Sequence, residues 1–219
     1  MPKLILIIVT LFSVAISLAW ASNASKGSPP RVFTDNELKQ VIDKYGPMAG
    51  RRLQAWQQLI DDNYTKPERL KLQRVNDFFN GAQFTTDQKV WGKEDYWATP
   101  IEFLGLDAGD CEDYVIAKYF TLKAMGVPEE KLYLTYVKAI RLKQAHMVLT
   151  YFKTPKSEPL VLDNINDRIM KAGQRKDLIP IYSFNGDGLW LSKQRGKGKA
   201  VEGGTDKLKN WNSLLKKMQ

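Results

Sequence analysis

The first third of the chain carries apolar residues at helical spacing. The segment Thr34–Glu37 has the residue types of a capping box and predicts a helix that continues to about residue 45. Apolar positions then recur every three or four residues over 51–61 and over about 67–80, which predicts two further helices. The N-terminal part of the protein is therefore expected to be helical.

A more apolar helix is predicted from residue 111 onward. The residues at offsets of 4, 8 and 11 from Cys111 are Val115, Tyr119 and Leu122. Such spacing places them on one side of a helix, and Asp110 is a preferred N-cap residue type. Cys111 is thus expected in the first turn of a mostly buried helix.

Beyond residue 126 the pattern changes to short runs of β-branched, aromatic and aliphatic residues, which are typical of strands. The predicted strands cover residues 131–140, 145–152, 160–163, 179–184 and 188–191, the last two joined as a hairpin. The basic run Lys193–Lys199 is expected to be a solvated loop, and residues 206–218 an amphipathic helix. Helices followed by an antiparallel sheet predict an α+β fold.

The N-terminus has the features of an export signal. Lys3 precedes an apolar run that ends in Ala19-Trp20-Ala21, a small-x-small cleavage pattern. We predict a signal peptide over 1–21, a Ser- and Pro-rich linker over 22–33, and a single domain over 34–219. An uncleaved anchor is the alternative, although the apolar run is short for a membrane span.

Composition narrows the possible partners and the redox setting. The 219-residue chain has a formal net charge of +9. For an exported protein this charge favours an acidic partner or a membrane surface over nucleic acid. The single cysteine can form no internal disulfide, and a free thiol in an oxidising compartment suggests reactivity.

Three residue types suited to nucleophilic catalysis follow one another along the chain. Cys111 begins a helix, where backbone N–H groups and the macrodipole favour a thiolate. His146, the only histidine, lies on a predicted strand, and Asp163 ends the next strand. A cysteine nucleophile needs a base and a group that orients that base. The alternative is that Cys111 is a small, inert core residue.

Three acids surround the cysteine. Asp110, Glu112 and Asp113 lie within four residues, and their charge would raise the pKa of the Cys111 thiol. They could cap the helix, with Asp110 as N-cap and Asp113 as its capping-box partner. They could instead bind a hard cation such as Ca2+, which prefers carboxylate oxygens. The spacing leaves both interpretations open.

The chain resembles the bacterial transglutaminase-like cysteine proteinases. The resemblance lies in the element Asp110-Cys-Glu-Asp113, followed by His146 and by Asp163 in Leu-Val-Leu-Asp-Asn164. The upstream Tyr96-Trp97-Ala-Thr-Pro100 and the export signal fit the same family. The resemblance implies a papain-like or transglutaminase-like core. It also implies a Cys111, His146 and Asp163 triad, with Ca2+ bound by Asp110, Glu112 and Asp113.

The resemblance further implies a biological role. The expected substrate is the N-terminal region of a large surface adhesin, cut at an Ala-Ala pair followed by Gly in the periplasm, which would promote biofilm dispersal. The expected regulator is a LapD-like inner-membrane receptor for cyclic di-GMP that sequesters the protease. Two alternatives remain at this point: a transglutaminase-type acyltransferase, which uses the same triad, and a non-catalytic periplasmic peptide-binding module.

Overall fold

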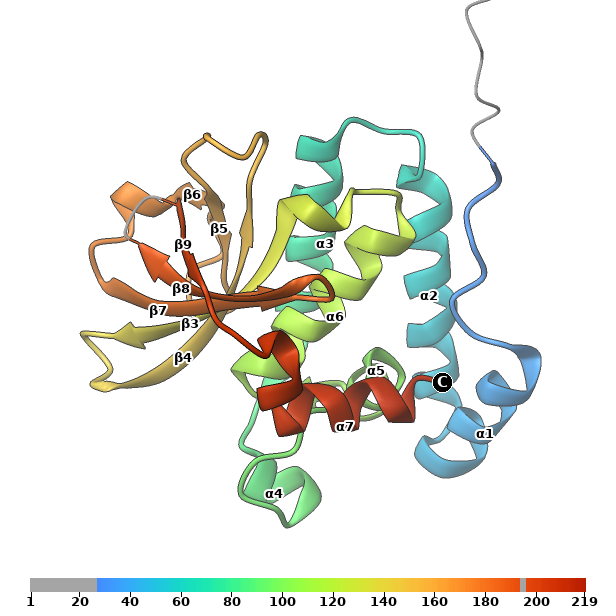
Figure 1. Ribbon diagram of the computed structural model, residues 1–219. Helices are drawn as coiled ribbons and strands as arrows, with labels where there is room; N and C mark the ends of the chain where they lie inside the picture. The colour runs from blue at the N-terminus through green and yellow to red at the C-terminus, as the bar shows by residue number, and fades with distance from the viewer. Residues whose placement is uncertain (1–26, 194–195) are drawn as a thin grey trace, which may run out of the picture.

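The computed structural model describes residues 27–193 and 196–219. Helices form one side of the molecule and a twisted antiparallel sheet forms the other (Figure 1). Across the described ranges, no helix is long and apolar enough to cross a membrane. The predicted signal peptide, residues 1–21, lies outside the described residues.

The predicted N-terminal helices are confirmed. Their bounds are α1 Asp35–Tyr45, α2 Pro47–Asn63 and α3 Glu68–Asn80. The Thr34 hydroxyl accepts a hydrogen bond from the Glu37 N–H at 3.1 Å, and Glu37 Oε2 accepts one from the Thr34 N–H at 2.6 Å. The capping box therefore satisfies otherwise unpaired N–H groups at the start of α1. Phe33, just before it, is buried beside Trp56 of α2.

Two short helices follow. They are α4 Asp87–Trp91, which the sequence did not predict, and α5 Pro100–Leu106. A second capping box, made by Thr99 and Glu102, starts α5.

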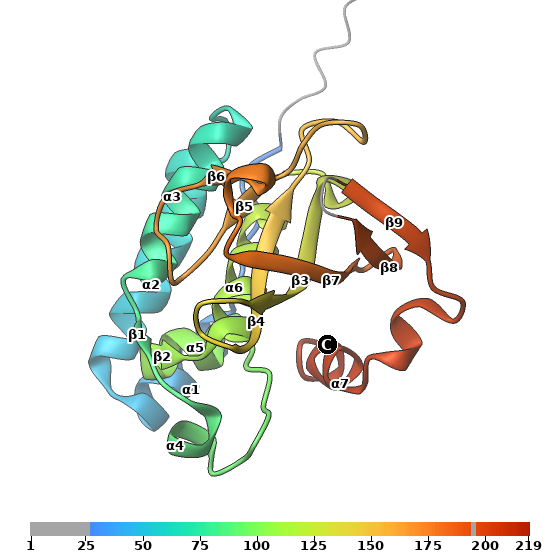
Figure 2. The same ribbon diagram turned by 90° about the vertical axis from the view of Figure 1, so that its left-hand side faces the viewer.

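The cysteine begins α6, Cys111–Ala124, as predicted. This helix lies between α3 and the sheet (Figures 1 and 2). Residues on all its sides are buried: Asp113, Tyr114, Val115, Ile116, Ala117, Lys118, Tyr119, Thr121 and Leu122. A helix that is covered on every side belongs to the core rather than to an amphipathic surface layer.

In the described residues the main sheet has seven strands in the order β6-β5-β4-β3-β7-β8-β9, all antiparallel to their neighbours. Their bounds are β3 Leu132–Ala139, β4 Gln144–Tyr151, β5 Leu160–Leu162, β6 Met170–Lys171, β7 Leu178–Asn185, β8 Gly188–Lys193 and β9 Gly196–Ala200. His146 faces Val137 in the β3–β4 ladder. The predicted α+β class and the 179–191 hairpin are confirmed.

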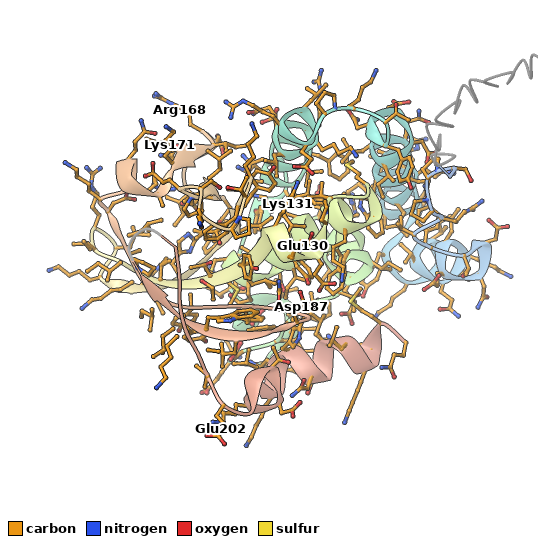
Figure 3. All side chains as sticks on the ribbon, turned by 45° about the horizontal axis from the view of Figure 1, so that its top comes forward. Glu130, Lys131, Arg168, Lys171, Asp187 and Glu202 are labelled. Atoms are coloured by element: carbon orange, nitrogen blue, oxygen red, sulfur yellow. The ribbon has the colours of Figure 1, made fainter. Side chains whose placement is uncertain are left out.

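Two segments differ from expectation. Residues 193–199 were predicted as a loop, but Lys193 ends β8 and residues 196–199 belong to the edge strand β9, which pairs with β8. This pairing can form without apolar side chains because it uses backbone hydrogen bonds. The C-terminal helix α7, Lys209–Lys217, starts later than predicted and follows a 3-10 turn over Gly204–Lys207. At the opposite sheet edge, Arg168 and Lys171 point outward (Figure 3).

Candidate active site

The backbone before Cys111 is fixed by a small parallel sheet. Strands β1, Gln83–Phe84, and β2, Ala108–Gly109, pair directly ahead of α6. The Gln83 N–H donates to the Asp107 carbonyl and the Thr85 N–H to the Gly109 carbonyl, both at 2.9 Å. A Cβ on Gly109 would come within 2.5 Å of Asp113 Oδ2, so this close approach requires glycine.

Cys111 and His146 line one cleft of about 700 Å³. Its aromatic wall includes Trp97, Tyr136 and Tyr182, and the last two rings stack with centroids 5.1 Å apart. The Cys111 thiol donates to Glu112 Oε2 at 3.2 Å. The candidate nucleophile and candidate base therefore open onto the same concave surface, which is large enough for a peptide segment.

The structure brings His146 and Asp163 into direct contact. His146 Nε2 lies 2.8 Å from Asp163 Oδ1, and the two side chains are 1% and 0% exposed. Asp163 Oδ1 also accepts a hydrogen bond from the Ile165 N–H at 3.0 Å. Burial alone would raise the pKa of Asp163. The hydrogen bond and charge of His146, together with the hydrogen bonds from the Ile165 N–H and Arg175, outweigh this effect and lower the pKa to about 2.

The ionised Asp163 selects one tautomer of the imidazole. A carboxylate accepts hydrogen bonds only, so Nε2 of His146 carries the proton in this contact. In the neutral ring, Nδ1 then holds the lone pair. His146 can therefore accept a proton at Nδ1 while Asp163 holds the other side of the ring.

Arg175 is part of this site, and the sequence analysis missed it. Its Nη2 donates to Asp163 Oδ2 at 2.7 Å and to Asp177 Oδ2 at 2.9 Å, and its side chain is 3% exposed. The sequence holds 33 basic residues, and nothing in its local pattern distinguishes this one. Only the tertiary structure shows that Arg175 supports the negative charge of Asp163.

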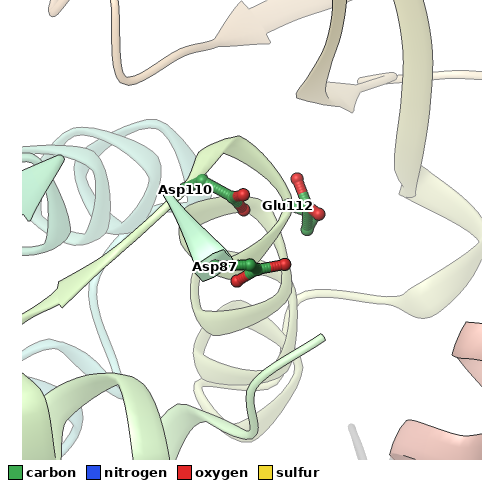
Figure 4. Close-up of side chains that lie close together, drawn as sticks. All are labelled: Asp87, Asp110 and Glu112. Atoms are coloured by element: carbon green, nitrogen blue, oxygen red, sulfur yellow. The ribbon is translucent and has the colours of Figure 1, made fainter. Parts of the chain in front are cut away.

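The acids near the thiol form a compact cluster. One potential ligand atom from each of Asp87, Asp110 and Glu112 lies within 4.8 Å of the others, and their carboxylates gather at one point (Figure 4). Burial, followed by the charge of Glu112, raises the pKa of Asp110 to about 9. Asp87, at the start of α4, was not predicted because it lies far from the other acids in sequence.

This cluster fits a hard cation. Asp87 Oδ1 and Asp110 Oδ1 are buried and, among the described residues, have no hydrogen-bond partner. Buried carboxylate oxygens are costly without partners, and Ca2+ takes oxygen ligands of this kind. Burial and the neighbouring Glu112 charge raise the pKa of the Cys111 thiol. A cation here would oppose the second of these effects.

Asp113 does not belong to this group of converging carboxylates. Its Oδ1 accepts a hydrogen bond from the Ala98 N–H at 2.8 Å, and its Oδ2 accepts one from the Asp110 N–H at 3.3 Å. The second contact is the capping-box bond expected from Asp110 and Asp113. The hypothesis that Asp113 binds a metal stays a prediction.

Part of the cleft wall comes from the C-terminal region, which was not predicted to belong to the site. The 207–210 segment lines the cleft. Asn210 Nδ2 donates to Asp95 Oδ2, and Lys217 Nζ donates to the Trp97 carbonyl, both at 2.6 Å. These contacts tie α7 to the aromatic segment before Cys111.

Residues 54–183 match the family model described as bacterial transglutaminase-like cysteine proteinase BTLCP. The chain belongs to this family. Its matched segment includes the acid cluster, Cys111, His146, Asp163 and Arg175, whereas the 207–210 wall of the cleft lies outside it. The predicted family and fold are thus confirmed, and membership supports the assignment as a cysteine protease.

Solved structures of one bacterial protein are similar to this chain. LapG of Legionella pneumophila is 41% identical, with 87% of this chain and 100% of that chain covered and a TM-score of 0.73. Calcium-bound and EGTA-treated forms of that LapG, also 41% identical, match with TM-scores of 0.72 and 0.74, covering 85% and 87% of this chain and 100% of theirs. No curated protein sequence matches the chain.

Proposed function

We propose that this cysteine proteinase is a calcium-dependent endopeptidase with Cys111 as nucleophile, His146 as general base and acid, and Asp163 as the orienting group. The observation that carries the proposal is the buried His146–Asp163 hydrogen bond, at 2.8 Å, beside a cleft that Cys111 shares. The chain belongs to a cysteine proteinase family, and this arrangement supplies the nucleophile, the base and the orienting group that a cysteine proteinase needs.

The proposed reaction begins when the Cys111 S–H group rotates from Glu112 toward His146 and transfers its proton to Nδ1. The Cys111 thiolate attacks the scissile carbonyl, and the resulting oxyanion accepts a hydrogen bond from the Cys111 backbone N–H at the start of α6. His146 then donates its proton to the leaving amine, which breaks the peptide bond and leaves a thioester. Water, activated by the same imidazole, hydrolyses the thioester and restores the thiol.

Calcium would be held by Asp87, Asp110 and Glu112, with Asp113 as a further candidate ligand from the sequence. Two buried carboxylate oxygens, on Asp87 and Asp110, support this assignment, since neither has a hydrogen-bond partner in the part of the chain that the structure describes. When bound, the cation supplies positive charge beside the nucleophile and offsets the repulsion among the acids. A calcium-bound structure exists for the Legionella LapG, which is 41% identical.

The similarity to LapG also supports a more specific role. We propose that the substrate is the N-terminal region of a large adhesin, cut at an Ala-Ala pair followed by Gly, so that the adhesin is released and biofilm disperses. We further propose a periplasmic location after removal of residues 1–21, with residues 34–219 as a single domain. A LapD-like receptor for cyclic di-GMP would sequester the enzyme.

The proposal is tested by incubating the mature protein with the N-terminal fragment of a large adhesin from the same organism. Parallel samples contain Cys111→Ala, EGTA, and EGTA followed by excess Ca2+. We expect cleavage that the substitution abolishes, that EGTA stops and that Ca2+ restores. Mass spectrometry identifies the products, and cross-linked species without cleavage would contradict a protease.

A further inference from the structure

Lys118 is a buried basic residue that the proposed reaction does not use. It lies on α6, seven residues or about two turns beyond Cys111, and is 0% exposed. Burying an amine is costly unless its N–H groups have acceptors. Lys118 Nζ donates to Asn76 Oδ1 at 2.9 Å and to Asn80 Oδ1 at 2.6 Å, both on α3. The lysine therefore bridges the nucleophile helix and α3 inside the core.

The two asparagine amides connect Lys118 to a loop. Asn76 Nδ2 donates to the Asp167 carbonyl at 2.9 Å. Asn80 Nδ2 donates to the Asp163 carbonyl and to Asp167 Oδ1, both at 2.8 Å. Carbonyl oxygens only accept hydrogen bonds, so each amide must present its NH2 group to the loop. Each amide oxygen then faces Lys118, which has N–H groups to donate.

The loop held in this way carries the acid of the proposed triad. Asp163 directly follows β5, and its backbone carbonyl is fixed by Asn80 while its side chain contacts His146. The position of the Asp163 carboxylate thus depends on contacts that begin at Lys118. A group anchored by a buried hydrogen-bond network is held more rigidly than one on a free loop.

We propose that Lys118, Asn76 and Asn80 are positioning residues that hold the 163–167 loop, and with it the Asp163 carboxylate, against His146. The inference rests on the proposed catalytic roles of His146 and Asp163. In this proposal α6 positions two groups of the site: it carries Cys111 in its first turn, and through Lys118 it holds the loop that carries Asp163.

The test uses two variants that break the network at different points. Asn80→Asp keeps an oxygen acceptor for Lys118 but has no N–H to donate to the Asp163 carbonyl. Lys118→Met removes the donors while keeping a long side chain of similar shape. Asn63→Asp is the matched control, since Asn63 is also buried on a helix but donates to the Leu59 carbonyl, within its own helix.

His146 is the only histidine, so NMR of the imidazole reports directly on the Asp163 contact. In Asn80→Asp and Lys118→Met we expect a shifted or faster-exchanging Nε2 proton. We also expect kcat to fall about ten- to a hundredfold with KM nearly unchanged, the usual effect of misplacing a catalytic group. Asn63→Asp should change neither the His146 Nε2 resonance nor kcat.

A merely structural role would lower the melting temperature of Asn80→Asp while leaving the His146 resonances as in wild type, and that result would overturn the inference. If Lys118→Met does not fold, Asn80→Asp decides alone. The NMR measurement needs no substrate. A wild-type protein that fails to cleave the adhesin would therefore count against the proposed function without deciding this inference.

Discussion

Changing Asp163 to asparagine should abolish activity by reversing the imidazole tautomer. Asp163 Oδ2 accepts a charge-assisted hydrogen bond from the Arg175 guanidinium, whereas Oδ1 accepts a weaker one from the Ile165 N–H. We therefore expect an asparagine to keep its oxygen toward Arg175 and to lose the Ile165 bond. Its NH2 group then faces His146 Nε2, which must accept instead of donate. The proton moves to Nδ1, the nitrogen assigned to deprotonate Cys111, and the base is lost. We expect kcat to fall by about four orders of magnitude.

The same substitution should also reduce stability. Relative to its ordinary value of 3.8, the Asp163 pKa of about 2 corresponds to about 2 kcal/mol of folded-state stabilisation at neutral pH. Because the folded-state pKa is depressed, this contribution is present above pH of about 4 and is lost as the pH falls through about 2. Arg175 also loses one of its two carboxylate partners, so the full cost should reach about 3 kcal/mol.

Asp177→Asn provides the control, since Asp177 pairs with the same guanidinium but lies at the surface, with its side chain 32% exposed. It should cost about 1 kcal/mol or less and leave kcat within about threefold of wild type. Chemical denaturation, steady-state cleavage and 15N NMR of His146 measure the three effects. The reasoning is refuted if Asp163→Asn retains the Nε2-protonated tautomer, or if both variants lose activity equally.

Three other predictions follow from single features of the structure. Asp87→Asn should weaken Ca2+ binding at least about tenfold, as measured by calorimetry. Asp43→Asn, which changes an exposed acid on α1, should leave the affinity unchanged. Equal affinities of the two variants would show that Asp87 is not a ligand. Gly109→Ala should cost about 1–3 kcal/mol in denaturation, because its Cβ would lie 2.5 Å from Asp113 Oδ2; a neutral result would contradict the tight packing. Burial lowers the pKa of Lys118 from 10.5 to about 7. Between pH 7 and 10.5 the unfolded chain therefore binds more protons than the folded one, and the free energy of unfolding should rise with pH by up to about 1.4 kcal/mol per pH unit. Lys118→Met should flatten this pH dependence, and an unchanged slope would show that Lys118 does not cause it.

Sequence reasoning succeeded where the signal is local. The capping box at Thr34 is recognisable because its hydrogen bonds join residues three apart. The α6 start at Cys111 follows from helical spacing and from the N-cap type of Asp110, and the strand at His146 follows from a run of apolar, β-branched and aromatic residues. These interactions depend on backbone geometry that a short stretch of sequence determines by itself.

The parts that escaped prediction depend on contacts between distant segments. Asp87 joins Asp110 only because β1 and β2 pair and bring their flanking residues together. Arg175 contacts Asp163 across a sequence separation of 12 residues, over a segment that includes β6 and a 3-10 helix at Ala172–Gln174. The β9 strand forms through backbone pairing, and its sequence, Gly196-Lys-Gly-Lys-Ala200, has no alternating apolar positions to indicate a strand. Each case needs the tertiary fold, which single-sequence periodicity does not encode.

The burial of α6 on every side has a consequence for how the protein loses activity. A helix enclosed by α3 and by the sheet cannot separate from the core without exposing most of it. The amide protons beyond its first turn, which are hydrogen-bonded within the helix, should therefore exchange with solvent only when the whole molecule opens, at the slow limit set by global unfolding. Since Cys111 is part of this helix, heat should inactivate the thiol site and unfold the protein in one step, without a partly folded species that keeps the nucleophile in place.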